Sequence, residues 1–227
     1  MRGYYDWFSP PILILVKSFR VPDIFKSIKL PILSRLENEL DPRLGYHNLS
    51  HTLDVVEQAE IIAKQEKIND KHELLLLKTA AVFHDSGFLA VYKNHEEKSC
   101  EIASESLKNV FSEEDIKKVC GMIMATKIPQ TPHTLLEQII CDADLDYLGR
   151  NDFEPISRNL YQEFLTFKII PENIIWDHIQ IKFFESHHYF TGTSISKRNQ
   201  KKLKHLNILK ERSNWAQWTE DLFYLNY

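Results

Sequence analysis

The sequence predicts an all-α fold in a single domain, and three observations support that prediction. Only six glycines occur among 227 residues, so the rhythm of short strands and tight turns is nearly absent. Long stretches instead place apolar residues at i, i+3, i+4 and i+7, which is the spacing of one helix face. A chain of this length can bury one large core, and no linker or internal repeat divides it.

Residues 1–22 are expected to form an N-terminal arm ahead of the helical domain at 23–227. The apolar run at 11–16 is short, whereas a membrane-spanning helix needs about 20 apolar residues. No small-residue cleavage site follows this run before Lys17. We therefore expect neither a signal peptide nor a membrane anchor. The arm is expected to pack on the domain or to dock on the second subunit of a homodimer.

Local signals set the limits of the predicted helices. Ser112 stands before three acidic residues, which suits a helix start, and Pro129 and Pro132 close that helix. After Gly149, Asn151 or Asp152 is expected to cap the next helix. The predicted helices span residues 23–40, 50–67, 71–90, 96–110, 112–126, 133–148, 152–167, 172–190, 194–211 and 214–225.

Charge and cysteine content exclude several classes of protein. The net charge is −4, so no large basic field exists and nucleic acid is not an expected partner. One local group of basic residues is expected to be the solvated face of a helix, with an anion site as the alternative: Lys197, Arg198, Lys201, Lys202 and Lys204. The three cysteines, Cys100, Cys120 and Cys141, include no CxxC pair, which favours small core residues in a reducing cytoplasm.

Histidine and aspartate side chains stand where ionised groups are costly. His84-Asp85 follows an apolar helical run, and Asp142, Asp144 and Asp146 lie inside another. Burying such groups costs several kcal/mol unless they are paired or bind a cation. A divalent metal offsets that cost, and imidazole with carboxylate ligands suits Mn, Fe, Co, Ni or Zn, while carboxylates with water suit Mg.

These residues resemble the pattern of a known family. His51, then His84-Asp85, then Asp144 is similar to the H…HD…D order of the HD superfamily of metal-dependent phosphohydrolases. Residues 46–55, YHNLSHTLDV, resemble the YHNxxHxxDV signature of class I cyclic-nucleotide phosphodiesterases, and the ADL sequence at Asp144 resembles their last metal-binding element. The resemblance covers about residues 30–190 and implies an HD-type helical bundle.

The resemblance also implies a role for each matching residue. The implied metal ligands are His51, His84, Asp85 and Asp144. Asp85 is counted among the catalytic residues together with His47, which matches the histidine that protonates the leaving oxygen. A capping or core histidine is the alternative for His47. Asp54 is expected either to orient an imidazole or to be a surface charge, and Asp142 rivals Asp144 for the last ligand position.

One position departs from the family pattern. The phosphodiesterases carry a further histidine four residues after their HD histidine, and bacterial cyclic-dinucleotide enzymes carry a lysine there, but this chain has Phe88. His95, followed by Glu96, is a candidate for a second metal or a phosphate contact. Gln180 and Phe183 have the QxxF spacing of the phosphodiesterase base clamp and are candidate substrate-binding residues. The alternative for them is an exposed glutamine and a core phenylalanine.

The sequence thus predicts metal-dependent hydrolysis of a small phosphoester, with a nucleotide as the expected partner molecule. A bound metal lowers the pKa of water and offsets phosphate charge. Cyclic-nucleotide cleavage is the leading expectation. The alternatives are a nucleotide or nucleoside-monophosphate phosphohydrolase, and a catalytically silent HD module that binds a nucleotide or a protein.

Overall fold

The computed structural model describes residues 21–173 and 175–224, so the expected arm at 1–22 lies almost wholly outside the described residues. Within them the backbone contains helices and no strand, and the all-α prediction is confirmed. None of these helices is long and apolar enough to cross a membrane. The elements are α1 (Val21–Glu39), α2 (Leu49–Gln65), α3 (Lys71–Phe83), η1 (Ser86–Leu89), α4 (His95–Leu107), α5 (Glu113–Ala125), α6 (Leu135–Asp144), η2 (Asp146–Gly149), α7 (Phe153–Thr166), α8 (Trp176–Ser186) and α9 (Gly192–Tyr224).

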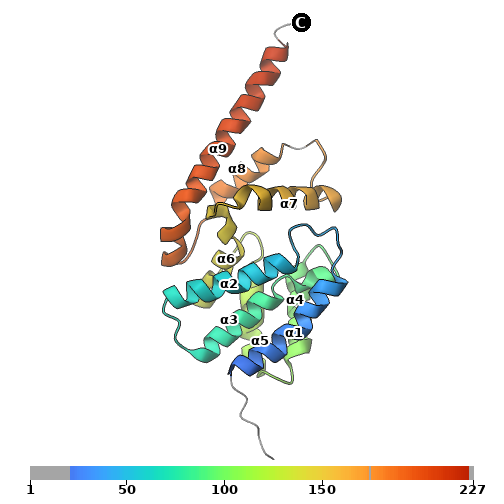
Figure 1. Cartoon of the computed structure of the whole chain (residues 1–227), viewed down its shortest axis with the longest axis vertical. Coiled ribbons are helices and arrows are strands. Elements are labelled where there is room, and N and C mark those ends of the chain that lie inside the picture. Colours follow the sequence, from blue (N-terminus) through green and yellow to red (C-terminus); the bar gives the residue numbers. More distant parts are fainter. Residues whose placement is uncertain (1–20, 174, 225–227) are drawn as a thin grey trace, which may run out of the picture.

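The helices form two groups, each with its own core (Figure 1). Helices α1–α6 form a bundle in which α3 packs against α1, α2 and α5. Its core is largely aliphatic and includes Val55, Leu77 and Ile123. Helices α7–α9 stand on one end of this bundle, around a smaller, more aromatic core that includes Phe153 and Phe184.

The predicted helix at 71–90 is too long at its C-terminal end. Helix α3 ends at Phe83, and the chain continues through His84 and Asp85 into the buried 3-10 turn η1. Gly87 in this turn approaches α4 so closely that a Cβ atom there would lie 1.9 Å from the carbonyl oxygen of His95. The turn therefore places the His84-Asp85 pair at a helix end and brings α4 beside it.

The structure also corrects three later predictions. The helix predicted at 133–148 stops at Asp144 and resumes as η2. The helix predicted at 172–190 is reduced to α8, because the backbone N–H groups of Phe190 and Thr191 donate to the buried carboxylate of Asp142. Asp152 makes no capping bond to α7, since its carboxylate binds Arg150 instead.

The predicted helices at 194–211 and 214–225 are one continuous helix, α9. Its basic residues are not all solvated as expected. Arg198 binds the carboxylate of Asp146 through two hydrogen bonds of 2.8 Å, and Lys202 is buried and donates to the carbonyl of His187. The Arg198–Asp146 contact fixes α9 against η2, and the Lys202 contact fixes it to the end of α8.

Candidate metal centre and adjoining cavity

Three helix ends bring the four expected ligands together. His51 lies in the first turn of α2, where the Asn48 side chain caps the helix and accepts from the backbone N–H of His51. His84 and Asp85 follow the last residue of α3, and Asp144 is the last residue of α6. Because α2 packs on both α3 and α6, these ends converge.

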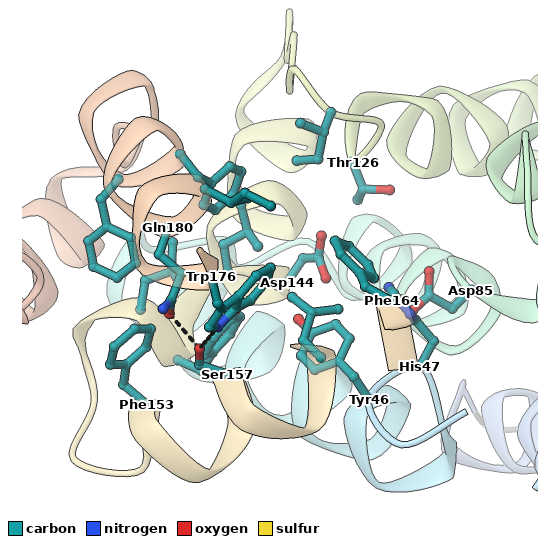
Figure 2. A pocket seen from close by; sticks show the side chains of 18 of the residues that line it. Tyr46, His47, Asp85, Thr126, Asp144, Phe153, Ser157, Phe164, Trp176 and Gln180 are labelled. Carbon is teal, nitrogen blue, oxygen red and sulfur yellow. Dashed lines mark hydrogen bonds between the residues drawn. The ribbon is translucent and has the colours of Figure 1, made fainter. Parts of the chain in front are cut away.

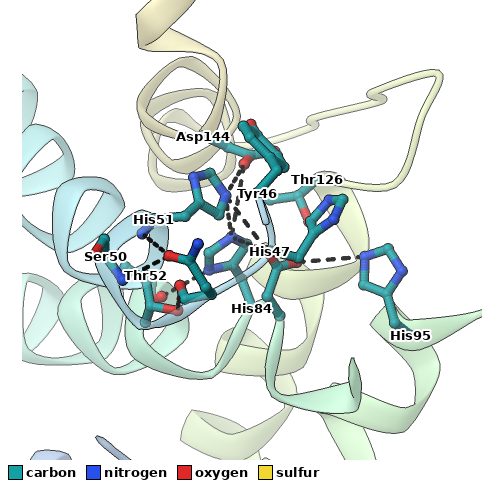
Figure 3. Close-up of polar contacts among 12 residues, drawn as sticks. Tyr46, His47, Ser50, His51, Thr52, His84, His95, Thr126 and Asp144 are labelled. Carbon is teal, nitrogen blue, oxygen red and sulfur yellow. Dashed lines mark hydrogen bonds and ion pairs between the residues drawn. The ribbon is translucent and has the colours of Figure 1, made fainter. Parts of the chain in front are cut away.

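The ligand atoms lie close enough to share one ion (Figure 3). Ligand atoms of His51, His84 and Asp85 all lie within 4.8 Å of one another. The Oδ1 atom of Asp144 is 3.2 Å from Nε2 of His51 and 3.6 Å from Nε2 of His84. These atoms come from four side chains, two imidazoles and two carboxylates, which is a donor set that suits a divalent transition metal.

Two details show that the residues fit a cation. The Nδ1–H of His84 donates to the carbonyl of Ala81 at 2.8 Å, which leaves the lone pair on Nε2 facing the cluster. The Oδ2 atom of Asp85 is buried and has no hydrogen bond of good geometry, although Nε2 of His84 lies 3.1 Å and Nε2 of His51 3.4 Å away. A buried carboxylate oxygen that is not fully satisfied by hydrogen bonds is costly, and a bound cation removes that cost.

Charge in the cluster is balanced by protons when no metal is bound. Burial alone would lower the pKa of His51, but hydrogen bonds and charge from Asp144 and Asp85 raise it to about 9. Burial would raise the pKa of Asp144, yet the two histidines lower it to about 2. The carboxylates thus favour positive charge at this point, which a divalent ion supplies in place of two protons.

His47 lies beside the cluster and is held by a buried carboxylate. Its Nδ1 is 2.5 Å from Oε1 of Glu163, and the other Glu163 oxygen accepts from the backbone N–H groups of Tyr46 and His47. Tyr92 donates its hydroxyl to Oε1 of the same carboxylate at 2.8 Å. Burial raises the pKa of Glu163, but the bonds from His47 and the backbone outweigh burial, and the net direction is downward.

A cavity of about 290 Å³ opens from this cluster toward α7 and α8 (Figure 2). Asp85, Asp144 and His47 line one end of it. The other end lies between the two helix groups and is mostly apolar and aromatic. It is lined by Leu145, Tyr147, Leu148, Phe153, Ser157, Leu160, Phe164, Trp176, Ile179, Gln180, Phe183 and Phe184.

Comparison with known proteins identifies the part of the chain that holds this site. Residues 48–146 match the family model of the HD domain. This stretch of the chain is an HD domain. This family comprises metal-dependent phosphohydrolases, and HD domains bind divalent metals, in agreement with the cluster of His51, His84 and Asp85.

Two similar proteins extend the comparison. The crystal structure of a predicted HD superfamily hydrolase from an uncultured Thermotogales bacterium matches with a TM-score of 0.52 and 25% identity, over 85% of this chain and 92% of that one. An uncharacterized protein of Clostridium beijerinckii is 37% identical over 83 residues, which are 35% of this chain and 52% of that protein. The chain thus spans about half the length of that relative. The HD-type helical fold is confirmed by the family match and by the structural match.

Within the HD domain, the placement favours Asp144 over Asp142 as the last ligand. Asp142 points away from the cluster and accepts from Phe190 N, Thr191 N and the Thr191 hydroxyl. One of the two expected roles of Asp54 was to orient an imidazole, and the structure does not show this. Its carboxylate accepts from Arg150 at 2.8 Å, so the alternative of a charge at the surface describes it better.

Phe88, the departure from the family pattern, packs against two histidine rings of the site. Its ring stacks at 4.3 Å from His47 and 4.1 Å from His95, measured between centroids. His95 is thereby placed with Nε2 at 3.4 Å from Oδ1 of Asp85 and 3.5 Å from Oε1 of Glu96. The Oδ2 atom of Asp85 therefore faces the two histidine ligands, and its Oδ1 atom faces His95.

Gln180 and Phe183 both line the far end of the cavity, and Gln180 is buried, not exposed. Its Oε1 accepts from the Ser157 hydroxyl at 2.5 Å, and its Nε2 donates to Asp177 at 3.2 Å. Ser157 in turn accepts from Nε1 of Trp176 (Figure 2). The orientation of the Gln180 amide is therefore set by its neighbours.

Sequence reasoning missed Glu163 and Ser157, both of which lie on α7. Glu163 is separated from His47 by 116 positions, and no short motif joins the two. The only available signal was periodicity: Phe153, Ser157, Leu160 and Glu163 share one helix face. A carboxylate on an otherwise apolar face indicates a buried partner, although it does not identify that partner.

Proposed function

We propose that this chain hydrolyses the phosphoester of a nucleotide-like small molecule with the help of a divalent metal. The observation that carries the proposal is the arrangement at one end of the cavity. There the ligand set of the HD domain lies beside a histidine whose Nδ1 is held by the buried Glu163. When bound, the metal polarises a phosphoryl oxygen and lowers the pKa of water.

His47 is the proton donor in this proposal. Because Glu163 engages Nδ1, the remaining ring nitrogen, Nε2, is the atom from which a proton reaches the leaving oxygen. The ionised Glu163 stabilises the positive charge that His47 carries before the transfer. Tyr92 and two backbone N–H groups hold Glu163 in place, so the orientation of His47 is fixed before substrate arrives.

Within this activity, cleavage of a cyclic nucleotide is the finer proposal. The similarity of residues 46–55 to the class I phosphodiesterase signature supports it. The aromatic far end of the cavity, which includes Trp176 and Phe183, also suits a flat base. Hydrolysis of a nucleoside monophosphate is the alternative, and the same cavity serves both substrates.

The metal-dependent activity is tested with a chromogenic phosphodiester. We expect turnover to stop with a chelator and to return with Mn, Co, Ni, Zn, Fe or Mg. The His84→Ala and Asp85→Ala proteins should lose bound metal. The matched control is His133→Ala, at an exposed histidine just before α6, and it should keep its metal. A purified protein that binds metal fully but turns over no phosphoester would favour the silent binding module.

The base contact is tested with two substrates of different size. A base stacked on Phe183 would contribute about 1–3 kcal/mol by analogy with aromatic stacking on nucleic acid bases. Phe183→Ala should therefore raise KM for a cyclic nucleotide and leave a small ester without a base nearly unchanged. Equal losses on both substrates, together with a lower Tm, would mean that Phe183 only packs the core.

A further inference from the structure

The charged side chains of the cavity lining are mainly acidic. Among the described residues that line it, none is lysine or arginine, and the only basic side chains are His47 and His95. Three carboxylates face the same space, namely Asp85, Glu96 and Asp144. One divalent ion offsets two of these three negative charges, so the lining has no surplus of positive charge for an anionic substrate.

Two basic residues that adjoin the lining are directed elsewhere. Lys127 stands between two lining residues, Thr126 and Ile128, but its ammonium group pairs with Glu97. Arg150 pairs with three carboxylates, those of Asp54, Asp146 and Asp152, on the other side of Tyr147 from the cavity. Neither cation is available to a phosphate without breaking an existing pair.

The far end of the cavity offers no alternative place for negative charge. Its polar groups are joined in one chain of hydrogen bonds, from Trp176 through Ser157 to Gln180 and on to Asp177. The remaining lining at that end is aromatic or aliphatic. A phosphoryl group placed there would lose its hydration without gaining a counter-charge.

Protein sites for di- and triphosphates differ from this one, because they supply several cationic or backbone N–H partners to the additional phosphates. We propose, building on the proposed function, that the site selects substrates with a single phosphoryl group attached to a flat, weakly polar body. Nucleoside diphosphates and triphosphates are rejected by the carboxylate-rich lining. The selection is electrostatic, so it acts on binding before any chemical step.

The test compares adenosine monophosphate, diphosphate and triphosphate. Dissociation constants for the full-length, Mn-loaded protein are measured by calorimetry at low ionic strength, with free Mn held constant because the polyphosphates chelate it. We expect each added phosphoryl group to weaken binding about tenfold, as like charges in a partly buried site imply. Initial rates of hydrolysis are measured on the same series.

Charge variants at the rim provide the matched control. Ile128 lines the cavity but is 53% exposed, so its replacement costs little stability. Ile128→Lys should narrow the gap between triphosphate and monophosphate binding about threefold or more, Ile128→Glu should widen it, and Ile128→Gln should leave it nearly unchanged. This order separates charge from shape, because the three side chains are similar in length.

The possible outcomes distinguish a failure of the charge selection from a failure of the proposed hydrolysis. Triphosphate binding as tight as or tighter than monophosphate binding overturns the charge selection, whether or not hydrolysis occurs. If no phosphoester is hydrolysed with any metal but affinity falls along the series, the proposed hydrolysis fails and the charge selection stands. Rim variants that do not follow the order Lys, Gln, Glu would also contradict an electrostatic origin.

Discussion

His47 and Glu163 form a pair that separates metal binding from proton transfer. The histidine stacks on Phe88, and its Nδ1 is held by Glu163, which points this nitrogen away from the four expected ligands. His47→Ala should therefore keep its metal and lower kcat by about 10²–10⁴-fold, the usual effect of losing a general acid. The deficit should shrink with a nitrophenolate leaving group, which needs no proton.

Glu163→Gln tests the other half of the same pair. The amide keeps the shape but cannot stabilise a charged imidazole, so kcat should fall and the alkaline limb of the pH–rate profile, which follows loss of the proton from the general acid, should move to lower pH. The metal content should stay full. Metal content measured together with kinetics distinguishes a proton donor from a metal ligand. Loss of metal in His47→Ala would instead make His47 a ligand.

At the level of single residues, the sequence identified those site residues that lie in short motifs. His84-Asp85 is recognisable because two ionisable side chains follow an apolar run, and the YHN and ADL sequences mark His47 and Asp144. The structure brings His47, Asp85 and Asp144 to one end of a cavity. Glu163 carries no such mark, because its partner His47 lies in the loop before α2, in the other group, and only the fold joins them.

Among the elements, α9 depends on one buried ion pair. Arg198 donates twice to Asp146, whose carboxylate is 2% exposed, and Gly149 permits the close approach because a Cβ atom there would lie 2.6 Å from the Arg198 backbone oxygen. Arg198→Met leaves the buried carboxylate of Asp146 with a single counter-charge, Nη1 of Arg150, which is 3.6 Å away and is shared with Asp54. We expect it to lower the free energy of unfolding by about 3–5 kcal/mol.

The double variant Arg198→Met with Asp146→Asn is the control for this prediction, since it removes both charges. It should recover much of the lost free energy of unfolding, measured by urea denaturation. A single variant that costs less than about 1 kcal/mol would show that the pair behaves as an exposed one.

Helix type was easier to predict than helix ends. The apolar spacing correctly indicated helices throughout, and Ser112 caps α5 as expected. Ends were missed where a contact distant in sequence stops a helix, as Asp142 does by binding the N–H groups of Phe190 and Thr191. Such a contact overrides local propensity and leaves no local pattern.

At the scale of the whole molecule, the cavity lies where two cores meet. The bundle of α1–α6 supplies the ligand set, and α7 and α8 supply most of the aromatic far end (Figure 1). Sequence periodicity could predict that both groups are helical. It could not predict that the smaller core would stop short of the larger one and leave a space between them.

The boundary between these groups almost coincides with the end of the HD match at residue 146. The metal ligands lie inside the matched stretch, whereas the far-end residues from Phe153 to Phe184 lie beyond it. Under the proposed function, metal binding and base recognition are encoded in separate parts of the chain, and the proton donor His47 with its partner Glu163 also lies outside the matched stretch. A homologue aligned only over 48–146 would share the metal ligands, but its proton donor and its substrate would depend on the sequence outside that stretch, including α7 and α8.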